Sequence, residues 1–387
     1  MSRELKVLQV IGSMDARTGG PSYSIKALAD HLHHYEIKTD IWTFNYPYQD
    51  KPIKLKNNAQ HFIAPDFFLS RKLSSWNPWI KSSLRSIIGK YDLIHNNGQW
   101  LMGNYYAHLL AERVGKPLIV SPRGMLEPWA LGSKELKKKI AWRLYEKRNL
   151  DSAAVFHATS PAEAASLRRL GFRQPIAVIP NGVELNPVAF GEKEKKTVLF
   201  LSRIDIKKGL ERLISIWGRK MGCFPDWELV IAGDGDKGYL NQLKKSVQDK
   251  GMSGRVRWAG FAGDEMKKCL YENASVFILP TFSENFGNAI AEALSFGVPV
   301  VTTEGTPWND IQVERCGWYV KNSEPAIEAA LVEALQTSAV NLVEMGMRGR
   351  QLIEKKYSWP KVAGEMAQTY QWILKMRDTP PECMRFD

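Results

Sequence analysis

Short runs of aliphatic and β-branched residues alternate with segments of helical periodicity along almost the whole chain. A helix is predicted over Pro21–His34, and within it Ile25, Leu28 and Leu32 fall on one face at spacings of three and four. Strands as apolar as these runs are typical of parallel sheets that helices cover on both faces. The runs predicted as strands are LKVLQVIG, IKTDIWTFN, YDLIHNNG, KPLIVSPRG, AVFHATS and IAVIPNG in the first half, and TVLFLSRID, WELVIAGDG, RVRWAGF, ASVFILP and VPVVTTEG in the second.

The alternating pattern occurs twice, and a segment rich in turn residues and charge separates its two copies. This segment, PNGVELNPVAFGEKEKK, centres on residues 183–196. The predicted fold class is therefore α/β, with two Rossmann-like, doubly wound domains over residues 1–185 and 186–365. In such folds ligands bind beyond the carboxyl ends of the strands, so two domains that face each other would form a central cleft there.

Composition and charge are those of an ordinary globular protein with a basic surplus. The chain has 387 residues, 44% hydrophobic and 24% charged, which is too long for one ordinary core. No run approaches the roughly 18 apolar residues of a membrane span, and the chain opens directly on a strand-like run rather than on a signal sequence. Four scattered cysteines favour a reducing cytosol. The net charge of +12 suits nucleic acid, an anionic membrane or a phosphorylated small molecule.

The loop after the first predicted strand contains adjacent glycines at a predicted helix start. Gly19 and Gly20 precede Pro21, a favourable first residue of a helix, so exposed amides would face a ligand above the helix. The spacing is not G-x-G-x-x-G, which disfavours a nicotinamide site. A phosphate or sugar contact is one interpretation, and a flexible connector is the other.

Two further loops follow strands of the second domain. Arg203 and Lys208 lie beside Gly209, which opens a helix, and a guanidinium with an ammonium at a helix N-terminus suits a diphosphate. An ordinary basic turn would have the same composition. Asp234 and Asp236 resemble a metal-binding D-x-D, but in a glycine-rich turn aspartate is common for conformational reasons, and we expect no metal there.

The segment SENFGNAIAEALSFGVPVVTT places two carboxylates around a helix start. Gly287 can open a helix whose first amides, from Phe286 through Asn288, are unpaired and able to hold an anion. Glu284 precedes this helix and Glu292 follows one turn inside it, and carboxylates accept hydrogen bonds from sugar hydroxyls. Cations and amides for a diphosphate, with carboxylates for hydroxyls, describe a nucleotide-sugar. For Glu292 alone, a polar helix face is the alternative.

The ordered set of these motifs resembles a known family. The glycine pair after the first strand, SRIDIKKG, AGDG and SENFGNAIAEALSFGVPVV together resemble the family-4 retaining glycosyltransferases, over nearly the whole chain. The segment SPRGMLEPWALGSKELKK further resembles members that build bacterial surface polysaccharides. The family has the GT-B architecture of two Rossmann-like domains, in which the last helix, here expected over residues 366–387, often crosses back to the N-terminal domain.

The resemblance implies an activity and its participants. A hexose would move, with retention and without a metal or other cofactor, from a UDP- or GDP-sugar to a glycan or lipid-linked acceptor. The products would be bacterial polysaccharides such as O-antigen, capsule or exopolysaccharide. The alternatives are a nucleotide-sugar epimerase of the same fold and a basic nucleic-acid-binding protein. The nucleic-acid-binding protein would show a continuous cationic stripe with stacking aromatics.

The family's roles carry over to individual residues of the second domain. Glu292 would bind the ribose, Glu284 the hydroxyls of the donor sugar, and Phe261 would lie near the base. The diphosphate leaving group would be neutralised by Arg203 and Lys208. The amides of Phe286, Gly287 and Asn288 would hold sugar and phosphate oxygens, while Gly19 and Gly20 would approach the diphosphate from the N-terminal domain.

One departure concerns the loop after the fourth expected strand, where many relatives have a histidine and this chain has Arg123. Arginine can hold a sugar hydroxyl or a phosphate but cannot act as a base at neutral pH, and a structural role is the alternative. Asn97 stands where some relatives also have histidine and is a candidate acceptor contact. His95 is expected to be a buried strand residue.

Two segments of the first domain mix cationic with apolar side chains. Phe67–Ser86 and Ser133–Arg148 have the composition of an interfacial helix, as a lipid-linked acceptor on an anionic membrane would require. Their alternative is a basic outer helix whose apolar face packs on the sheet. The predicted location is cytoplasmic, with a peripheral contact to the inner face of the membrane under the first interpretation.

Overall fold

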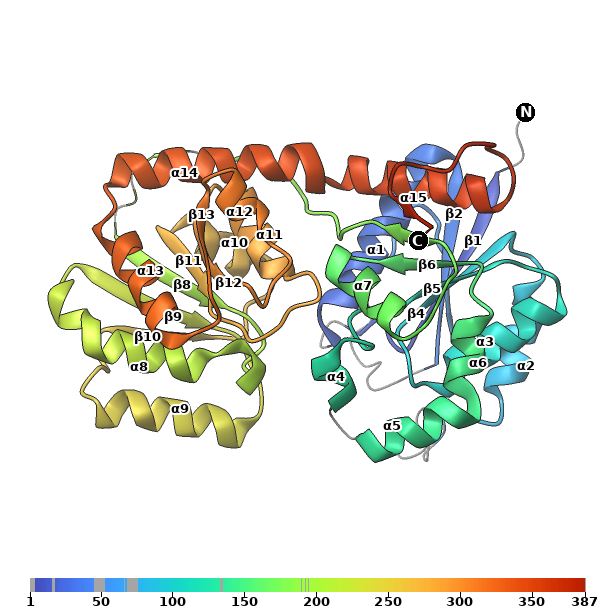
Figure 1. The fold of residues 1–387 in the computed structure, drawn as a ribbon, viewed down its shortest axis with the longest axis horizontal. Helices are drawn as coiled ribbons and strands as arrows, with labels where there is room; N and C mark the ends of the chain where they lie inside the picture. Colours follow the sequence, from blue (N-terminus) through green and yellow to red (C-terminus); the bar gives the residue numbers. More distant parts are fainter. Residues whose placement is uncertain are drawn as a thin grey trace. The chain divides into compact units, whose positions relative to one another are not determined.

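The computed structural model describes residues 4–15, 18–44, 53–65, 67, 76–132, 135–188, 190, 191, 193 and 195–386 (Figure 1). The chain divides into two compact units. The first unit comprises Met1–Gly182 and Trp359–Asp387, and the second comprises Val183–Ser358. The boundaries expected from the sequence, 185/186 and 365/366, lie a few residues further along the chain.

The first unit is built on an eight-stranded sheet, counted over the described residues, in the order β14-β7-β6-β5-β4-β1-β2-β3. All neighbouring strands are parallel except β14, which pairs antiparallel with β7. The order reverses between β1 and β4, so the loops that follow these two strands lie side by side. The strands are β1 Leu5–Ile11, β2 Ile37–Thr43, β3 His61–Ile63, β4 Leu93–Asn97, β5 Leu118–Ser121, β6 Val155–Ala158, β7 Ile176–Val178 and β14 Met384–Arg385.

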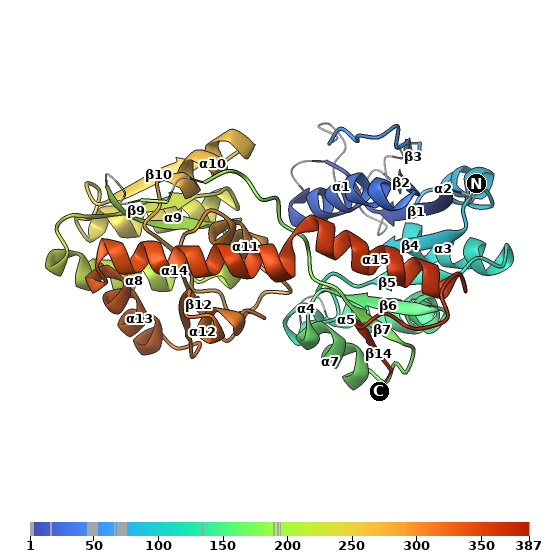
Figure 2. The same cartoon turned by 90° about the horizontal axis from the view of Figure 1, so that it is seen from above.

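Helices cover both faces of this sheet. Because side chains alternate along a strand, Leu8 and Val10 of β1 pack in one core with α2, while Leu5 and Val7 pack in another with α1 and α15. Helices α1 and α15 lie against each other over the second core (Figure 2). The helices are α1 Gly20–Leu32, α2 Ile80–Ile88, α3 Met102–Arg113, α4 Pro128–Gly132, α5 Glu135–Ala141, α6 Lys147–Asp151, α7 Pro161–Arg169 and α15 Trp359–Ile373, with the 3-10 turn η2 His33–Tyr35 and the π-helical turn η3 Trp142–Glu146.

The second unit contains a six-stranded parallel sheet, again counted over described residues, in the order β10-β9-β8-β11-β12-β13. Its order reverses between β8 and β11. The strands are β8 Lys196–Leu201, β9 Trp227–Ala232, β10 Val256–Gly260, β11 Val276–Leu279, β12 Val300–Thr303 and β13 Gly317–Val320. The helices are α8 Leu210–Lys220, α9 Lys237–Asp249, α10 Asp264–Glu272, α11 Asn288–Ser295, α12 Asp310–Val313, α13 Glu324–Gln336 and α14 Ala339–Leu352, with short turns η4 Ile206–Lys208, η5 Met221–Cys223 and η6 Ile353–Tyr357.

The parallel α/β prediction is confirmed, and the sequence missed three strands. These are β3, β13 and β14, each of two to four residues and each at the edge of its sheet. Most of their residues are not buried, so they lack the continuous apolar run by which buried strands of similar length, such as β5 and β6, were recognised. The first helix begins at Gly20 rather than Pro21 and ends at Leu32, because a 3-10 turn and then Glu36 in the left-handed conformation end it.

No single helix in the described ranges is long and apolar enough to cross a membrane. The pair Glu324–Gln336 and Ala339–Tyr357, bent by 115°, passes the same test of length and composition only when its two members are taken together.

Candidate active site

The site residues of the second unit are gathered by the strand reversal. β8 and β11 are neighbours, with Val198 opposite Val276, and the loop after β8 carries Arg203 while the loop after β11 carries Glu284. Backbone and side-chain bonds join these loops, since Phe282 N donates to Lys207 O at 2.8 Å. The sequence motifs that were read separately therefore belong to one edge of one sheet.

Lys208 and Glu284 form an ion pair, and both side chains are largely buried. The glutamate is fixed further, because its backbone amide donates to Gly305 O at 2.7 Å. Gly209 follows with φ 70°, and an added Cβ would lie 2.0 Å from the carbonyl oxygen of Pro280. Only glycine allows the β8 loop to approach the β11 loop this closely.

Arg203 and Phe261 are both exposed. Within the described part of the chain, the guanidinium of Arg203 has no hydrogen-bond or ion-pair partner. Phe261 exposes 64% of its surface and follows Gly260, which has φ 72°. A cation and an aromatic ring left open in this way are available to a ligand.

The N-terminus of α11 presents backbone amides at the same edge. Gly287 precedes the helix with φ 89°, and among the described residues nothing accepts a hydrogen bond from the amides of Phe286 and Gly287. Trp308 fixes the backbone at Phe286, because its indole Nε1 donates to Phe286 O at 2.5 Å and the two rings lie 5.2 Å apart. Open amides at a helix N-terminus form an anion site.

Glu292 is held by two residues of α10 that the sequence analysis did not identify. The hydroxyl of Tyr271 donates to Glu292 Oε2 at 2.9 Å, and Lys267 Nζ lies 3.6 Å from Oε1. Burial, and then the glutamate charge, raises the pKa of Tyr271 well above its ordinary value, so the hydroxyl stays protonated and donates. No spacing in the sequence indicates this contact, because α10 and α11 are joined through β11.

In the first unit the structure brings Arg123 and Asn97 together. Arg123 Nη2 and Nε donate to Asn97 Oδ1 at 2.9 and 3.2 Å, and Nη1 donates to Asn181 Oδ1 at 3.0 Å. Arg123 has φ 56°, a left-handed conformation uncommon for this residue, and the amide of Gly124 beside it donates to the buried Glu163 at 2.6 Å. Burial lowers the pKa of Arg123 to about 10, so the guanidinium remains charged at neutral pH.

His95 is buried in β4, as predicted. Its Nδ1 lies 2.7 Å from the hydroxyl of Tyr370, and its Nε2 lies 2.6 Å from Ser121 Oγ. Burial lowers its pKa well below the ordinary value, with smaller contributions from His157 and Arg123. The imidazole is therefore neutral and belongs to the interior of the first unit.

The glycine pair lies at the N-terminus of α1. Gly19 precedes the helix with φ 83° and ψ −152°, a backbone region essentially restricted to glycine, and Gly20 is the first helical residue. Ser22 Oγ donates to Ser13 O at 3.0 Å and joins the helix start to the loop after β1. Because β1 and β4 are neighbours in the sheet, this loop and Asn97 belong to the same edge.

The aspartates of the glycine-rich turn have local roles. Asp236 caps α9 by accepting from Tyr239 N at 2.9 Å, and Asp234 accepts from Gly235 N at 2.8 Å. Across the described residues, no three His, Cys, Asp or Glu side chains gather as a metal site would require. These contacts agree with the turn interpretation of both aspartates.

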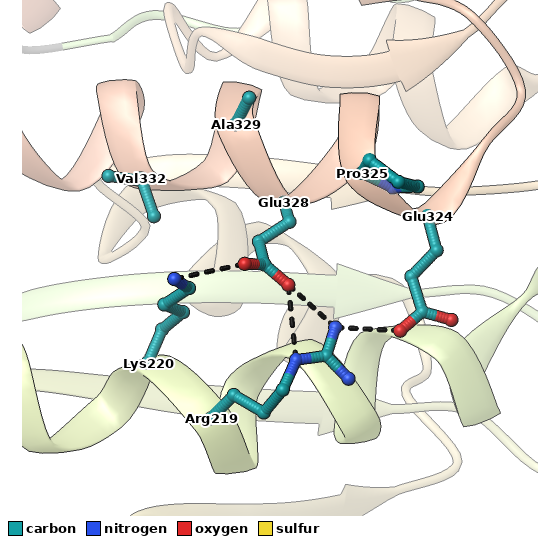
Figure 3. Close-up of a pocket in the computed structure, with 7 residues that line it drawn as sticks. All are labelled: Arg219, Lys220, Glu324, Pro325, Glu328, Ala329 and Val332. Carbon is teal, nitrogen blue, oxygen red and sulfur yellow. Dashed lines mark hydrogen bonds and ion pairs between the residues drawn. The ribbon is translucent and has the colours of Figure 1, made fainter.

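A hollow between α8 and α13 of the second unit is lined by compensating charges (Figure 3). Arg219 lies 2.6 Å from both Glu324 and Glu328, and Lys220 lies 2.9 Å from Glu328. None of the predicted site residues lines this hollow. Its ion pairs join the two helices and leave no charge open for a ligand.

The fold is that of GT-B glycosyltransferases. A sucrose-phosphate synthase from Thermosynechococcus elongatus superposes with a TM-score of 0.78 at 20% identity, over 96% of this chain and 100% of the other. The structure of Anabaena HepE in complex with UDP and glucose superposes with a TM-score of 0.73 at 17% identity, over 95% and 100% of the two chains.

Matches to protein-family models identify the family of the chain more specifically than the fold does. The model for Glycosyltransferase Family 4 matches residues 18–186, and the model for Glycosyl transferases group 1 matches residues 184–349. The chain is also 24% identical, over 96% of its length and 97% of the relative's, to the GDP-mannose:cellobiosyl-diphosphopolyprenol alpha-mannosyltransferase of Xanthomonas oryzae pv. oryzae. The protein belongs to the family-4 glycosyltransferases, which confirms the resemblance drawn from the motifs and sets aside the epimerase and nucleic-acid-binding alternatives.

Proposed function

We propose that the protein transfers a hexose, with retention and without a metal ion, from a UDP- or GDP-sugar to a glycan or lipid-linked acceptor in bacterial surface-polysaccharide synthesis. The observation that carries this proposal is the convergence, at the strand reversal of the second unit, of Arg203, Lys208 and the open amides before α11. Cations and helix amides at one edge suit a diphosphate, and the neighbouring carboxylates suit hydroxyls.

The leaving diphosphate would be met by Arg203 and Lys208. An ammonium has three donors, so Lys208 has two left after its bond to Glu284. Negative charge grows on the diphosphate as the sugar departs, and fixed cations therefore stabilise the transition state more than the ground state. Glu284 would accept from the sugar hydroxyls and Glu292 from the ribose, with Phe261 against the base.

The part of the site that binds the acceptor would use Arg123 and Asn97 of the first unit, and Gly19 and Gly20 would contact the diphosphate. Arg123 stays protonated at neutral pH, so it binds an oxygen and removes no proton. In the front-face route that we favour, the departing phosphate accepts the proton of the acceptor hydroxyl while the new glycosidic bond forms on the face that the diphosphate leaves. No enzyme nucleophile takes part in this route.

A lipid-linked acceptor would bring the first unit to a membrane surface. On α5 and η3 the apolar side chains Leu136, Ile140 and Leu144 recur every fourth residue and expose 74%, 52% and 74%. Cations beside them are Lys137, Lys139 and Arg143. This composition fits an interfacial helix on an anionic leaflet, and the Xanthomonas relative is named for a diphosphopolyprenol acceptor.

The other basic segment has a different arrangement. In α2 the apolar residues Ile80, Leu84, Ile87 and Ile88 are buried in the core, as the packed-helix alternative expects. Residues 68–75 of Phe67–Ser86, and residues 133 and 134 of Ser133–Arg148, lie outside the described residues. The α5 segment is therefore the one that we propose for membrane contact.

Calorimetric titration with UDP, GDP and ADP, in buffer containing EDTA, tests the donor site. We expect one nucleotide to bind, with GDP the first to test because of the relative's donor, and we expect Arg203→Ala to weaken binding at least tenfold. Arg257→Ala, which alters an exposed arginine paired with Glu228, is the matched control. Absence of binding by any diphosphate at millimolar concentration would overturn the proposal.

Co-sedimentation with vesicles tests the membrane contact. Binding is expected to vesicles rich in phosphatidylglycerol and not to pure phosphatidylcholine, and the triple change of Leu136, Ile140 and Leu144 to serine should abolish it. Val313→Ser, at an apolar side chain of the second unit that exposes 67%, should leave binding unchanged. Equal sedimentation of both variants with anionic vesicles would contradict this surface.

A further inference from the structure

A continuous chain of hydrogen bonds runs through the interior of the first unit from Arg123 to the last helix. Arg123 donates to Asn97 Oδ1, and Asn97 Nδ2 donates to Gln9 Oε1 at 2.8 Å. Gln9 Nε2 donates to the hydroxyl of Tyr370 at 3.0 Å. Gln9, Asn97 and Tyr370 expose at most 1% of their surface, so water does not compete for these bonds.

The chain continues past Tyr370 through two histidines. His95 Nδ1 lies 2.7 Å from the Tyr370 hydroxyl, and His95 Nε2 lies 2.6 Å from Ser121 Oγ. Ser121 Oγ lies 2.7 Å from His157 Nδ1, and His157 Nε2 lies 2.8 Å from the carbonyl oxygen of Ile179. Both imidazoles are neutral, because burial lowers the pKa of His157 to about 3 and that of His95 well below its ordinary value.

The two ends of the chain fix the direction of every bond between them. A carbonyl oxygen only accepts, so His157 carries its proton on Nε2 and accepts from the Ser121 hydroxyl at Nδ1. The serine oxygen then accepts from His95 Nε2–H, and His95 Nδ1 accepts from the Tyr370 hydroxyl. At the other end a guanidinium only donates, which orients the amides of Asn97 and Gln9 in the same sense.

Tyr370 is the member of this chain that comes from α15 rather than from the sheet or its loops. Its hydroxyl accepts from Gln9 and donates to His95, so it closes the contact between the strand that carries Asn97 and the strand that carries Gln9. Gln9 Nε2 also lies 3.3 Å from His95 Nδ1, a longer approach to a nitrogen that the Tyr370 proton already occupies. Without the hydroxyl, the glutamine loses the acceptor that holds its amide in place.

We infer that Tyr370 and Gln9 are positioning residues, which fix the guanidinium of Arg123 and the amide of Asn97 for an oxygen of the sugar, phosphate or acceptor. The inference rests on the proposed function. Three of the five N–H groups of Arg123 are directed to Asn97 and Asn181, which leaves two for that oxygen. Small displacements of a binding group lower turnover strongly, so a partner that never touches the substrate can affect the rate.

Tyr370→Phe tests the inference, because it keeps the ring and removes the hydroxyl. At saturating donor we expect kcat for transfer to fall about tenfold or more, with the affinity for the nucleoside diphosphate changed less than twofold. The matched control is Tyr35→Phe, which removes a hydroxyl of η2 that donates to Pro360 O of α15 at 2.8 Å and takes no part in the hydrogen-bond chain. This control should retain full kcat. Equal kcat for the two variants would overturn the inference.

Nitrogen NMR of histidine-labelled protein gives a readout that does not depend on activity. In the unaltered protein His95 and His157 should be neutral and protonated at Nε2, and Tyr370→Phe should shift the Nδ1 resonance of His95 while leaving that of His157 nearly unchanged. Charged imidazoles, or the opposite tautomers, would contradict the hydrogen-bond chain described above and overturn the inference. The proposed function fails if the tautomers are as expected but the unaltered protein binds no nucleoside diphosphate and transfers no sugar. If the unaltered protein is active and the Tyr370→Phe and Tyr35→Phe variants have equal kcat, only the positioning role is refuted.

Discussion

The ammonium of Lys208 is paired with the carboxylate of Glu284, although 76 residues separate them in the chain. Their side chains expose only 14% and 11%, so each charge depends on the other for the solvation that water would supply elsewhere. The pair also joins the loops after β8 and β11. Folding of the second unit and donor binding are therefore expected to depend on the same two residues.

Removing one partner of this pair should destabilise the protein more than removing both. Lys208→Met leaves the Glu284 charge uncompensated and is expected to lower the free energy of unfolding by about 2–4 kcal/mol. The double variant Lys208→Met with Glu284→Gln should lose less than the sum of the single changes. Urea unfolding of the four proteins in a double-mutant cycle measures the coupling.

Lys196→Met provides the matched control for that cycle. Lys196 Nζ lies 3.7 Å from Asp226, and these side chains expose 56% and 74%. A solvated pair of this kind contributes little, so the change should remain within about 0.5 kcal/mol. If Lys196→Met and Lys208→Met had equal effects, burial would not be what makes the Lys208 pair strong.

The sequence was sufficient for the strand and helix pattern, and for the placement of each motif after a strand. Apolar periodicity reports neighbours two, three or four residues apart, which is enough to recognise a parallel α/β unit. The glycine at 287 likewise indicates the start of α11 through local backbone preference. These features are encoded within one element and its adjoining turn.

The contacts between elements could not be obtained in the same way. Nothing in the spacing of Lys208 and Glu284, or of Arg123 and Asn97, indicates that they touch, because register and loop geometry decide such pairs. The structure shows Lys208 paired with a carboxylate, whereas the sequence analysis interpreted it only as a ligand for a diphosphate. Tyr271 and Tyr370 were missed for the same reason, since each appears in the sequence as an ordinary aromatic residue of a helix.

Tyr271→Phe should weaken donor binding by releasing Glu292. The hydroxyl of Tyr271 donates to Glu292 Oε2, and its loss leaves, among the residues that the structure describes, only the 3.6 Å approach of Lys267 to hold that carboxylate. We expect the Kd for the nucleoside diphosphate to rise about three- to tenfold, since a hydrogen bond to a charged group contributes about 1.5–3 kcal/mol and only part of it acts on binding. Titration calorimetry measures the change.

Tyr239→Phe is the control for removing a tyrosine hydroxyl from the second unit. Within the described structure the hydroxyl of Tyr239 is buried without a hydrogen-bond partner, and it belongs to α9 of the same unit. Its removal should leave nucleotide affinity unchanged. The role of Tyr271 would be refuted if its variant bound as tightly as the Tyr239 variant.

Gly19→Ala should strain the backbone of the loop before α1 without causing a steric clash. An added Cβ would meet nothing within 4 Å, so the only obstacle is the combination of φ 83° and ψ −152°, at about 1–3 kcal/mol of strain. We expect a lower free energy of unfolding and reduced transfer activity. Gly89→Ala is the control, because that site is equally open but has φ −66°. Matching losses in both variants would show that φ at Gly19 is not the cause.

Glu146 should make the stability of the protein fall as the pH rises. It is the buried last residue of η3, where its carboxylate accepts from Trp100 N at 3.0 Å and Asn149 Nδ2 at 3.1 Å, and burial raises its pKa from 4.5 to about 7. The unfolded chain releases this proton at the lower pH, so stability is lost between about pH 4.5 and 7 and is constant above that range. A shift of this size corresponds to roughly 3 kcal/mol.

Glu146→Gln should remove that dependence, because the amide oxygen can still accept a hydrogen bond and no charge is buried. Urea unfolding at pH 5 and pH 8 measures it: the stability of the variant relative to the unaltered protein should rise by up to roughly 3 kcal/mol between the two pH values. Because His95 and His157 contribute equally to the pH dependence of stability in both proteins, taking the difference between the two proteins at each pH cancels that contribution. Glu135→Gln changes an exposed glutamate paired with Lys139 and should leave the stability at both pH values nearly unchanged. Parallel profiles for the unaltered protein and Glu146→Gln would mean that Glu146 is already ionised at pH 5, and that its two hydrogen bonds compensate its burial.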